Sequence, residues 1–227
     1  MPLIEGARSL GVALDAQQIA RLDAYLDAVL DVNRTLNLTS VRDRGDAVVR
    51  HLLDSLSVVP AWHALAGAAP PRRVLDLGTG GGFPGAVLAV AWPESRVLLI
   101  DGTGKKARAV ASCLERAGVT NGEALQARGA DLPKLRPAAR ASFDLCVARA
   151  VGPAADLVRE LAPLVAAGGR ILLMKGPNTA ADEIADGERE ARRHGLVAEP
   201  SRTADVPGLE RRVLLVYAAY SRRAVDS

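Results

Sequence analysis

The sequence predicts an α/β protein with a mostly parallel sheet, helices on both faces and a helical N-terminal extension. From residue 73 to residue 219, short apolar segments alternate with segments of helical periodicity, which is the order that βαβ units produce. The residues before 67 show helical spacing only, and the small, proline-rich stretch 67–71 separates the two regions. We therefore expect a helical extension over 1–70, an α/β domain over 71–220 and a tail over 221–227.

Two helices are predicted in the N-terminal extension. Asp15 is a suitable N-cap, and the apolar residues that follow it recur at helical intervals, at Ile19, Leu22, Leu26, Val29 and Leu30. A second helix is expected from about Asp46, because the apolar residues between 49 and 56 fall on one side of it. The polar segment 33–40 between the two helices is typical of a turn.

The α/β region predicts six strands and four helices in alternation. The predicted strands cover 73–78, 96–101, 123–127, 143–148, 170–174 and 213–219. The predicted helices lie near 83–92, 104–117, 154–165 and 179–194. Parallel strands end at one edge of their sheet, and ligands bind there in open α/β sheets. We therefore expect the functional site at the carboxyl ends of these strands.

Composition excludes several classes of protein. The formal net charge of +3 over 227 residues permits a phosphate-rich partner without demanding one. Cys113 and Cys146 stand far apart and are expected to be reduced thiols, and the three histidines lack metal-ligand spacing, so no metal site is expected. We find no signal segment and no apolar run of about 20 residues. A cytoplasmic, monomeric protein with no membrane partner is expected.

A glycine-rich turn follows the first predicted strand, in the sequence VLDLGTGGGFPG over 74–85. Glycines placed directly after a strand let the backbone turn tightly and let a ligand approach closely. A dinucleotide needs GxGxxG, which Gly80, Gly82 and Gly85 provide, with Asp101 near the distance expected for the residue that binds the ribose. The turn alone therefore permits a nicotinamide cofactor.

S-adenosylmethionine uses a related turn, with an acidic residue two positions before the first glycine of G-x-G-x-G. Asp76, followed by Gly78, Gly80 and Gly82, matches this pattern at the end of the strand. In the dinucleotide register the glycines begin two residues late, and Pro84 falls in the first turn of the helix. We therefore favour the methyl donor as the cofactor.

Each acidic residue then has an expected role. We expect Asp76 to interact with the positively charged methionine end of the donor, directly or through water. We expect Asp101 to accept hydrogen bonds from both ribose hydroxyls. The alternative for Asp101 is a solvated aspartate at a strand end.

Further segments make the chain resemble a known family, the small-subunit ribosomal RNA methyltransferase G (GidB-like) family. The segments are Asn37-Leu38-Thr39-Ser40, RHLLDSL over 50–56, DLGTGGGFPG over 76–85, Gly104-Lys105-Lys106, Ala148-Arg149-Ala150, Met174-Lys175-Gly176 and Arg211-Arg212-Val213. They occur in the right order over most of the chain. A methyltransferase of another family shares only the glycine turn and Asp101.

The resemblance implies a class I S-adenosylmethionine-dependent methyltransferase fold, which is a Rossmann-like one. It also implies transfer of a methyl group to N7 of one guanine in the decoding-region loop of 16S rRNA. The partner is then small-subunit rRNA or an assembling small ribosomal subunit. The cofactor contacts of the family carry over onto Gly78, Phe83, Gly129, Ala130 and Arg149.

The sequence departs from this family in three places. Ala130 stands where a Glu usually contacts the adenine edge, so the backbone of Ala130 or the neighbouring Asp131 is expected to substitute. Gly102 stands where a larger polar residue is common, and Arg212 replaces a usual histidine.

Chemistry at guanine N7 needs no general base, because N7 carries a lone pair and no proton at neutral pH. It can attack the sulfonium methyl in line, so catalysis is expected to depend on orientation. No residue is assigned as certainly catalytic, and the candidates are Asn37, Arg149 and Lys175. Since the product base is cationic, Arg149 is expected to hold the cofactor carboxylate or a phosphate and not the reacting edge.

The residues expected to bind RNA are Asn37, Lys105, Lys106, Lys175 and Arg211. An asparagine amide reads base edges and the cations hold phosphates. The alternatives are a turn-capping asparagine and plain solvated charges.

Three other functions stay open at this point. A small-molecule methyltransferase shares the glycine turn, although the matches at 37–40 and Arg149 argue against it. A nicotinamide-dependent oxidoreductase rests only on the spacing of Gly80, Gly82 and Gly85. A non-catalytic RNA-binding protein would follow if the change at Ala130 abolished cofactor binding.

Overall fold

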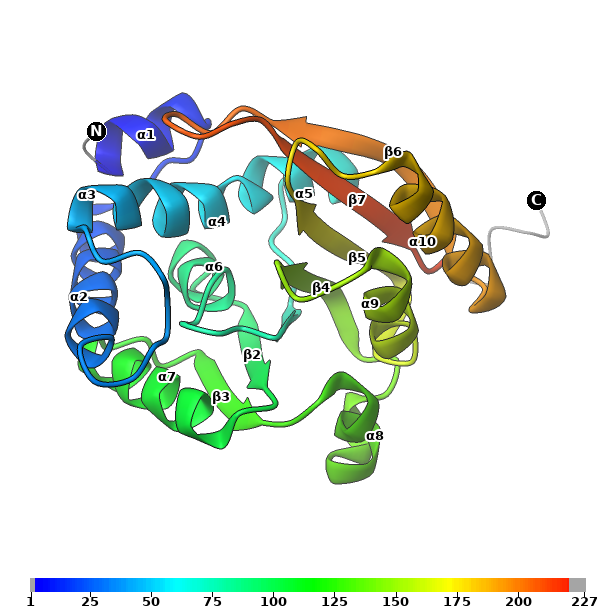
Figure 1. The fold of residues 1–227 in the computed structure, drawn as a ribbon, viewed down its shortest axis with the longest axis horizontal. Coiled ribbons are helices and arrows are strands. Elements are labelled where there is room, and N and C mark those ends of the chain that lie inside the picture. Colours follow the sequence, from blue (N-terminus) through cyan, green and yellow to red (C-terminus); the bar gives the residue numbers. More distant parts are fainter. Residues whose placement is uncertain (1–2, 221–227) are drawn as a thin grey trace.

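The structure, a computed structural model, describes residues 3–220 and has a seven-stranded sheet at its centre (Figure 1). The strands are β1 (Arg73–Leu77), β2 (Arg96–Asp101), β3 (Gly122–Gln126), β4 (Phe143–Arg149), β5 (Val165–Lys175), β6 (Val197–Ala204) and β7 (Arg212–Ala218). Their order is β3-β2-β1-β4-β5-β7-β6. Strands β1 to β5 are parallel, and β7 is antiparallel to both β5 and β6. The predicted α/β class with a mostly parallel sheet is confirmed; the expected tail over 221–227 lies outside the described residues.

Helices cover both faces of this sheet. They are α1 (Leu3–Ser9), α2 (Ala16–Val32), α3 (Arg44–Ala47), α4 (Asp54–Leu56), α5 (Val58–Ala66), α6 (Gly85–Ala91), α7 (Gly104–Arg116), α8 (Leu132–Leu135), α9 (Ala154–Leu161) and α10 (Ala181–Arg193). A π-helical segment, Val48–Leu53, joins α3 to α4. Side chains from α2, α6 and α7 share a core with one face of the sheet, and side chains from α9 and α10 share a second core with the other face.

Helix α2 forms where its sequence predicts it. The side chain of Asp15 accepts a hydrogen bond from the backbone of Gln18, and the side chain of Gln18 accepts one from the backbone of Asp15. This capping box satisfies amide groups that the first turn of a helix leaves without partners. Leu22, Leu26 and Val29 follow at helical spacing and are fully buried. The helix therefore packs through a single apolar face.

The structure corrects several sequence-based expectations. The expected strand 170–174 is part of a longer strand that begins at Val165, and the expected helix near 154–165 ends at Leu161. Val165 pairs with Phe143 across a register shift in β4, so the first residues of β5 belong to the sheet although Gly168 and Gly169 interrupt their apolar pattern. Helices α1, α5 and α8 and strand β6 were not predicted. Helices α1 and α8 are short, and β6 is a polar edge strand that contains Pro200.

The N-terminal helices and the sheet share one continuous core. Leu22 and Leu26 of α2, and Leu52 of the π-helical segment, belong to the same buried cluster as Val74 of β1 and Leu99 of β2. The division of the chain into an extension over 1–70 and a domain over 71–220 stays a prediction. Within residues 3–220, none of the helices has both the length and the apolar character needed to cross a bilayer. The described cysteines, Cys113 and Cys146, are buried and form no disulfide.

Because of the shared core, we expect Leu26→Ala to destabilise the whole protein. Leu26 is fully buried, so the truncation leaves a cavity and lowers the free energy of unfolding by about 2–5 kcal/mol. Urea denaturation followed by circular dichroism and by tryptophan fluorescence should show one transition, shifted as a unit. Leu135→Ala is the matched control, since Leu135 is 59% exposed and should cost less than about 0.5 kcal/mol. Two transitions, of which only one shifts, would contradict a shared core.

Candidate active site at the carboxyl ends of the parallel strands

The glycine-rich turn after β1 is held by the carboxylate of Asp76. Oδ2 of Asp76 accepts hydrogen bonds from the hydroxyl of Thr79 at 2.6 Å and from the backbone N–H of Gly85 at 2.8 Å. Oδ1 of Asp76 is buried and has no hydrogen-bond partner among the described residues. Burial raises the pKa of Asp76 to about 6, although the bonds from Thr79 and Gly85 oppose the shift. Asp76 therefore joins the start of the turn to the start of α6.

Asp101, at the end of β2, holds the other side of the turn. Its Oδ2 accepts a hydrogen bond from the N–H of Gly80 at 3.1 Å, and its Oδ1 accepts one from the N–H of Thr103 at 2.8 Å. A Cβ atom added at Gly80 would lie 4.0 Å from the carbonyl oxygens of Gly78 and Leu38 and no closer to any other atom, so the protein does not crowd this position. Each carboxylate oxygen has two lone-pair sites, so Asp101 can accept further hydrogen bonds from a ligand. The two predicted acidic residues thus converge on one turn.

Tyr25 of α2 packs against the glycine turn. Its buried hydroxyl donates a hydrogen bond to the carbonyl oxygen of Gly81 at 3.0 Å. Gly82 has a φ of 90°, and a Cβ atom there would lie 1.7 Å from the oxygen of Tyr25. The third glycine of the motif is therefore required by a contact within the protein. The role of Tyr25 could not be predicted, because a tyrosine at helical spacing has no signal in the sequence beyond that of a core residue.

Phe83 is the centre of an aromatic cluster beside the turn. It is buried, and the ring of His51 stacks on it at 4.5 Å between centroids with an interplanar angle of 13°. The ring of Tyr25 meets it edge-on at 5.6 Å, and the guanidinium carbon of Arg149 lies 5.7 Å from its centroid. The cluster brings α2, the π-helical segment and the end of β4 together at one place.

Arg149, at the end of β4, is held by a buried carboxylate. Its Nη1 donates to Oδ2 of Asp54 at 2.9 Å and to the carbonyl oxygen of Arg50 at 2.8 Å. Nε of Arg212 donates to the other oxygen of Asp54, also at 2.9 Å. The side chain of Asp54 is 2% exposed, so one buried carboxylate forms ion pairs with two guanidinium groups. Arg149 keeps its Nε–H and one Nη2–H free of hydrogen bonds to described residues, and can donate them to a carboxylate or phosphate.

His51 is neutral and has both ring nitrogens engaged. Burial, and then the nearby charge of Arg149, lower the pKa of His51 to about 4. Nη2 of Arg149 lies 3.4 Å from Nδ1, and the hydroxyl of Thr39 lies 2.7 Å from Nε2. Because a guanidinium can only donate, Nδ1 accepts and Nε2 carries the proton that is donated to Thr39. His51 is packed, as its sequence context indicates, and orients Thr39 and Arg149.

The loop 33–40 lies against the glycine turn and carries Asn37. The carbonyl oxygen of Leu38 lies 3.5 Å from the position of a Cβ atom at Gly81. Oδ1 of the buried Asn33 accepts hydrogen bonds from the N–H groups of Leu38 and Thr39, so Asn33 caps this turn. Asn37 is exposed, and its amide forms no hydrogen bond with another described residue. The asparagine that caps the turn is thus Asn33, and Asn37 stays available to a ligand.

The cations predicted to bind RNA differ in whether they already form ion pairs within the protein. Lys105 is exposed and Lys106 half-buried, and both lie in the first turn of α7, directly after Asp101. Nζ of Lys175 donates to Oε1 of Glu183 at 2.7 Å and to the carbonyl oxygen of Gly152 at 2.5 Å, with the side chain 11% exposed. Arg211 lies at the same edge, since β7 begins beside the end of β5, and pairs with the exposed Asp205. Of the cations predicted to bind RNA, Lys105 and Lys106 are therefore the two that form no ion pair with described residues.

The segment after β3 contacts an unexpected carboxylate, that of Glu160. Gly129 is buried and its N–H donates to Oε2 of Glu160 in α9 at 3.1 Å, whereas the side chain of Ala130 is exposed. A Cβ atom at Gly129 would lie 2.7 Å from that same oxygen, so only glycine permits this approach. The sequence could not indicate Glu160, because α9 and the segment after β3 are 31 residues apart.

These residues fit the cofactor that the sequence analysis favours. The turn is uncrowded at Gly80, Asp101 has unused acceptor sites next to it, and Asp76 keeps one buried oxygen without a partner among the described residues. All three lie at the carboxyl edge of β1 and β2, where an open α/β sheet binds ligands. The order of the sheet and this turn define the fold of class I S-adenosylmethionine-dependent methyltransferases.

Solved structures share this fold. The ribosomal protein L11 methylase from Lactobacillus delbrueckii subsp. bulgaricus matches with a TM-score of 0.56 and 15% identity, over 76% of this chain and 79% of that one. A point mutant of the 16S rRNA (adenine(1408)-N(1))-methyltransferase from Catenulisporales acidiphilia matches with a TM-score of 0.55 and 17% identity, over 72% and 92%. At these identities the likeness shows the fold alone.

Sequence comparison then gives the family. The family described as rRNA small subunit methyltransferase G (GidB) matches residues 18–207. The ribosomal RNA small subunit methyltransferase G of Ralstonia nicotianae is 37% identical over 95% of this chain and 93% of its own length. The protein of the same name from Burkholderia pseudomallei is 43% identical over 82% and 80%. The chain belongs to the rRNA small subunit methyltransferase G family, which confirms the resemblance.

We expect Asp54→Asn to destabilise the protein strongly, because it leaves two partly buried guanidinium groups without a balancing charge. The expected loss in the free energy of unfolding is about 3 kcal/mol, as when one partner of a buried ion pair is removed. Urea denaturation measures it. Asp205→Asn is the control, since its ion pair with Arg211 is exposed and should contribute less than about 1 kcal/mol. Equal losses of unfolding free energy in the two variants would show that the buried ion pairs of Asp54 contribute no more to stability than the exposed pair of Asp205.

We expect the raised pKa of Asp76 to make stability fall as pH rises from 4 to 7. The pKa is about 6 in the folded protein and about 4 in an unfolded chain, so the folded state binds more protons in this range. Asp76→Asn removes the titration. The unfolding free energy of the wild type, minus that of the variant, should therefore drop by roughly 2 kcal/mol between pH 4 and pH 7. His51 titrates with the opposite effect but is present in both proteins, so it cancels. A difference that stays constant with pH would refute the assignment.

Proposed function

We propose that this protein transfers a methyl group from S-adenosylmethionine to N7 of a guanine in small-subunit rRNA. The observation that carries the proposal is the carboxyl edge of the sheet. There, Asp101 and the uncrowded Gly80 lie beside a cluster in which no described side chain is free to act as a base. Membership of the rRNA small subunit methyltransferase G family supports rRNA as the substrate. A cytoplasmic, monomeric enzyme belongs to the same proposal.

The turn and Asp101 would bind and orient the cofactor. Bound S-adenosylmethionine supplies a methyl group activated by attachment to a sulfonium. Asp101 has acceptor sites left for ribose hydroxyls, and its existing bonds to Gly80 and Thr103 fix the direction of the carboxylate. Asp76 lies behind the turn and places negative charge near it when ionised, which favours a cationic ligand. Arg149 can donate its free N–H groups to a carboxylate of the ligand.

A reaction at guanine N7 matches the absence of a free base in this cluster. Both nitrogens of His51 are engaged, Asp54 is bound by two arginines, and Asp76 is buried beneath the turn. N7 attacks with its own lone pair and has no proton to lose. The product base is cationic, and the pairing of Arg149 with Asp54 reduces the repulsion that a free guanidinium would exert. Orientation would then supply the rate, up to about 7–11 kcal/mol of the barrier.

The exposed residues around this edge are those proposed to hold RNA. Asn37 has a free amide on the loop beside the turn, and Lys105 and Lys106 follow Asp101 directly. Phosphate contacts from such lysines position a nucleic acid, and amide contacts read base edges. Lys175 and Arg211 would have to leave Glu183 and Asp205 to take part, so we assign them lesser roles.

The test is transfer of a labelled methyl group from S-adenosylmethionine to unmethylated small-subunit rRNA, as free RNA and in assembled subunits. We expect label at N7 of one guanine, found by mapping the modified bases. Asp101→Ala should weaken cofactor affinity about tenfold or more in calorimetry, because it removes a charged hydrogen-bond acceptor. Tyr220→Phe, a change at an exposed side chain, is the control. A folded protein that binds the donor but labels no rRNA would exclude the proposed function.

A further inference from the structure

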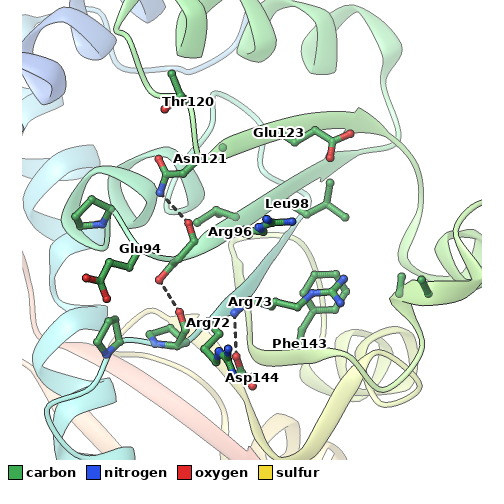
Figure 2. A pocket seen from close by; sticks show the side chains of 18 of the residues that line it. Arg72, Arg73, Glu94, Arg96, Leu98, Thr120, Asn121, Glu123, Phe143 and Asp144 are labelled. Atoms are coloured by element: carbon green, nitrogen blue, oxygen red, sulfur yellow. Dashed lines mark hydrogen bonds between the residues drawn. The ribbon is translucent and has the colours of Figure 1, made fainter.

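A large pocket lies at the opposite edge of the sheet, where the strands begin. It encloses about 1500 Å³ and is lined by the first residues of β1, β2, β3 and β4 and by the loops before them (Figure 2). Four of its lining residues are arginines: Arg72, Arg73, Arg96 and Arg136. The proposed methyl-transfer site uses none of them, since that site lies at the carboxyl ends of the same strands.

Three of these arginines lie outside any ion pair with the described residues, although acidic residues also line the pocket. Arg136 pairs with Glu123 across the pocket. Arg72, Arg73 and Arg96 are exposed and form no ion pair within residues 3–220. With Glu94, Glu123 and Asp144 as its acidic lining residues, the pocket has a net charge of +1.

The strand register holds two of the charges close together. Arg73 and Arg96 are paired positions on the neighbouring parallel strands β1 and β2, and Figure 2 shows their side chains extending in the same direction. The guanidinium of Arg73 lies 5.1 Å from the centroid of the Phe143 ring, which keeps the side chain extended. Like charges on adjacent strands repel each other, so an anion bound between them would remove an unfavourable interaction.

The neighbouring acidic and polar groups leave these guanidinium groups available. Asp144 accepts a hydrogen bond from the backbone N–H of Arg73 at 2.9 Å, and Glu123 is engaged by Arg136. The amide of Asn121 donates to three backbone carbonyls, those of Ala89, Trp92 and Ser95, and so fixes one wall of the pocket. The pocket therefore presents exposed guanidinium groups, whose planar arrangement of N–H donors suits phosphate oxygens.

We propose that this pocket binds the phosphate backbone of the substrate RNA, at a second site distinct from the methyl-transfer edge. The proposal rests on the proposed function. Strands of five or six residues separate the two edges by about 17–20 Å at 3.3 Å per residue, a distance that a folded RNA spans easily. No exposed aromatic ring lines the pocket, and Phe143 is buried beneath Arg73, so the site would hold phosphates and not stacked bases.

The test compares Arg72→Gln/Arg96→Gln with the wild type and with Arg189→Gln/Arg192→Gln. The control removes the same charge from exposed positions of α10, where the two side chains are 58% and 63% exposed. Arg73 is left unchanged because it packs on Phe143. The measurement is the affinity for an unmethylated small-subunit rRNA transcript as a function of salt, together with calorimetric affinity for S-adenosylmethionine as a check on folding.

We expect the pocket variant to bind the transcript about tenfold more weakly at 0.1 M salt, with a salt dependence shallower by about 1.4–1.8 in the log–log slope, as for two lost phosphate contacts. The control should change little, and affinity for the methyl donor should be unchanged in both variants. An unaltered affinity and slope in the pocket variant, or an equal loss in the control, would overturn the proposal. Normal binding of free rRNA with weakened binding of assembled subunits would also overturn it, in favour of a protein partner.

The two proposals fail separately in this design. If the wild type methylates rRNA but the pocket variant binds it normally, only the second site is excluded. If the pocket variant loses rRNA affinity while the wild type transfers no methyl group, the pocket is supported and the proposed reaction is excluded.

Discussion

The carboxylate of Asp76 is the constraint on which the rest of the site depends. It is fully buried at the end of β1 and binds both the hydroxyl of Thr79 and the N–H of Gly85, which fixes the two ends of the glycine turn. Once the turn is fixed, its N–H at Gly80 faces Asp101, and its carbonyl at Gly81 faces Tyr25. Burial of this carboxylate is energetically unfavourable, because one of its oxygens has no hydrogen-bond partner among the described residues. The raised pKa of Asp76 is a consequence of the same burial.

The N-terminal helices complete the site and do not merely cover the sheet. They contribute Tyr25 to the turn, His51 to the stack on Phe83 and Asp54 to the pair with Arg149. Asp54 also binds Arg212 of β7, so its carboxylate ties together three segments that are distant in sequence. This explains why one buried cluster contains side chains from α2, from the π-helical segment and from the sheet.

Most of the fold and part of the site could be predicted from the sequence. The buried strands and the cap of α2 depend on local patterns, so the alternation of elements and Asp15 were identified correctly. The edge strand β6 was missed because its side chains are largely polar and only its pairing with β7 defines it. The same reason applies to Tyr25, Asp54 and Glu160, whose roles come from contacts with residues 31 or more positions away. Local spacing indicated the glycine turn, whereas these partners are set by tertiary packing.

The π-helical segment Val48–Leu53 has a consequence for how this site tolerates change in length. A π-helix fits one more residue into a turn than an α-helix does, and an α-helix rotates about 100° per residue. The wide turn therefore sets the angular phase between Ala47 and Asp54, and with it the direction in which Asp54 faces Arg149 and Arg212. Relaxation of this segment to an α-helix at its present length would rotate the carboxylate by about 100°, away from both arginines, whereas loss of a single residue would let an ordinary helix form with nearly the same phase. Substitution at many of these positions is a matter of packing, but the π-helical winding at this length is part of the geometry of the site.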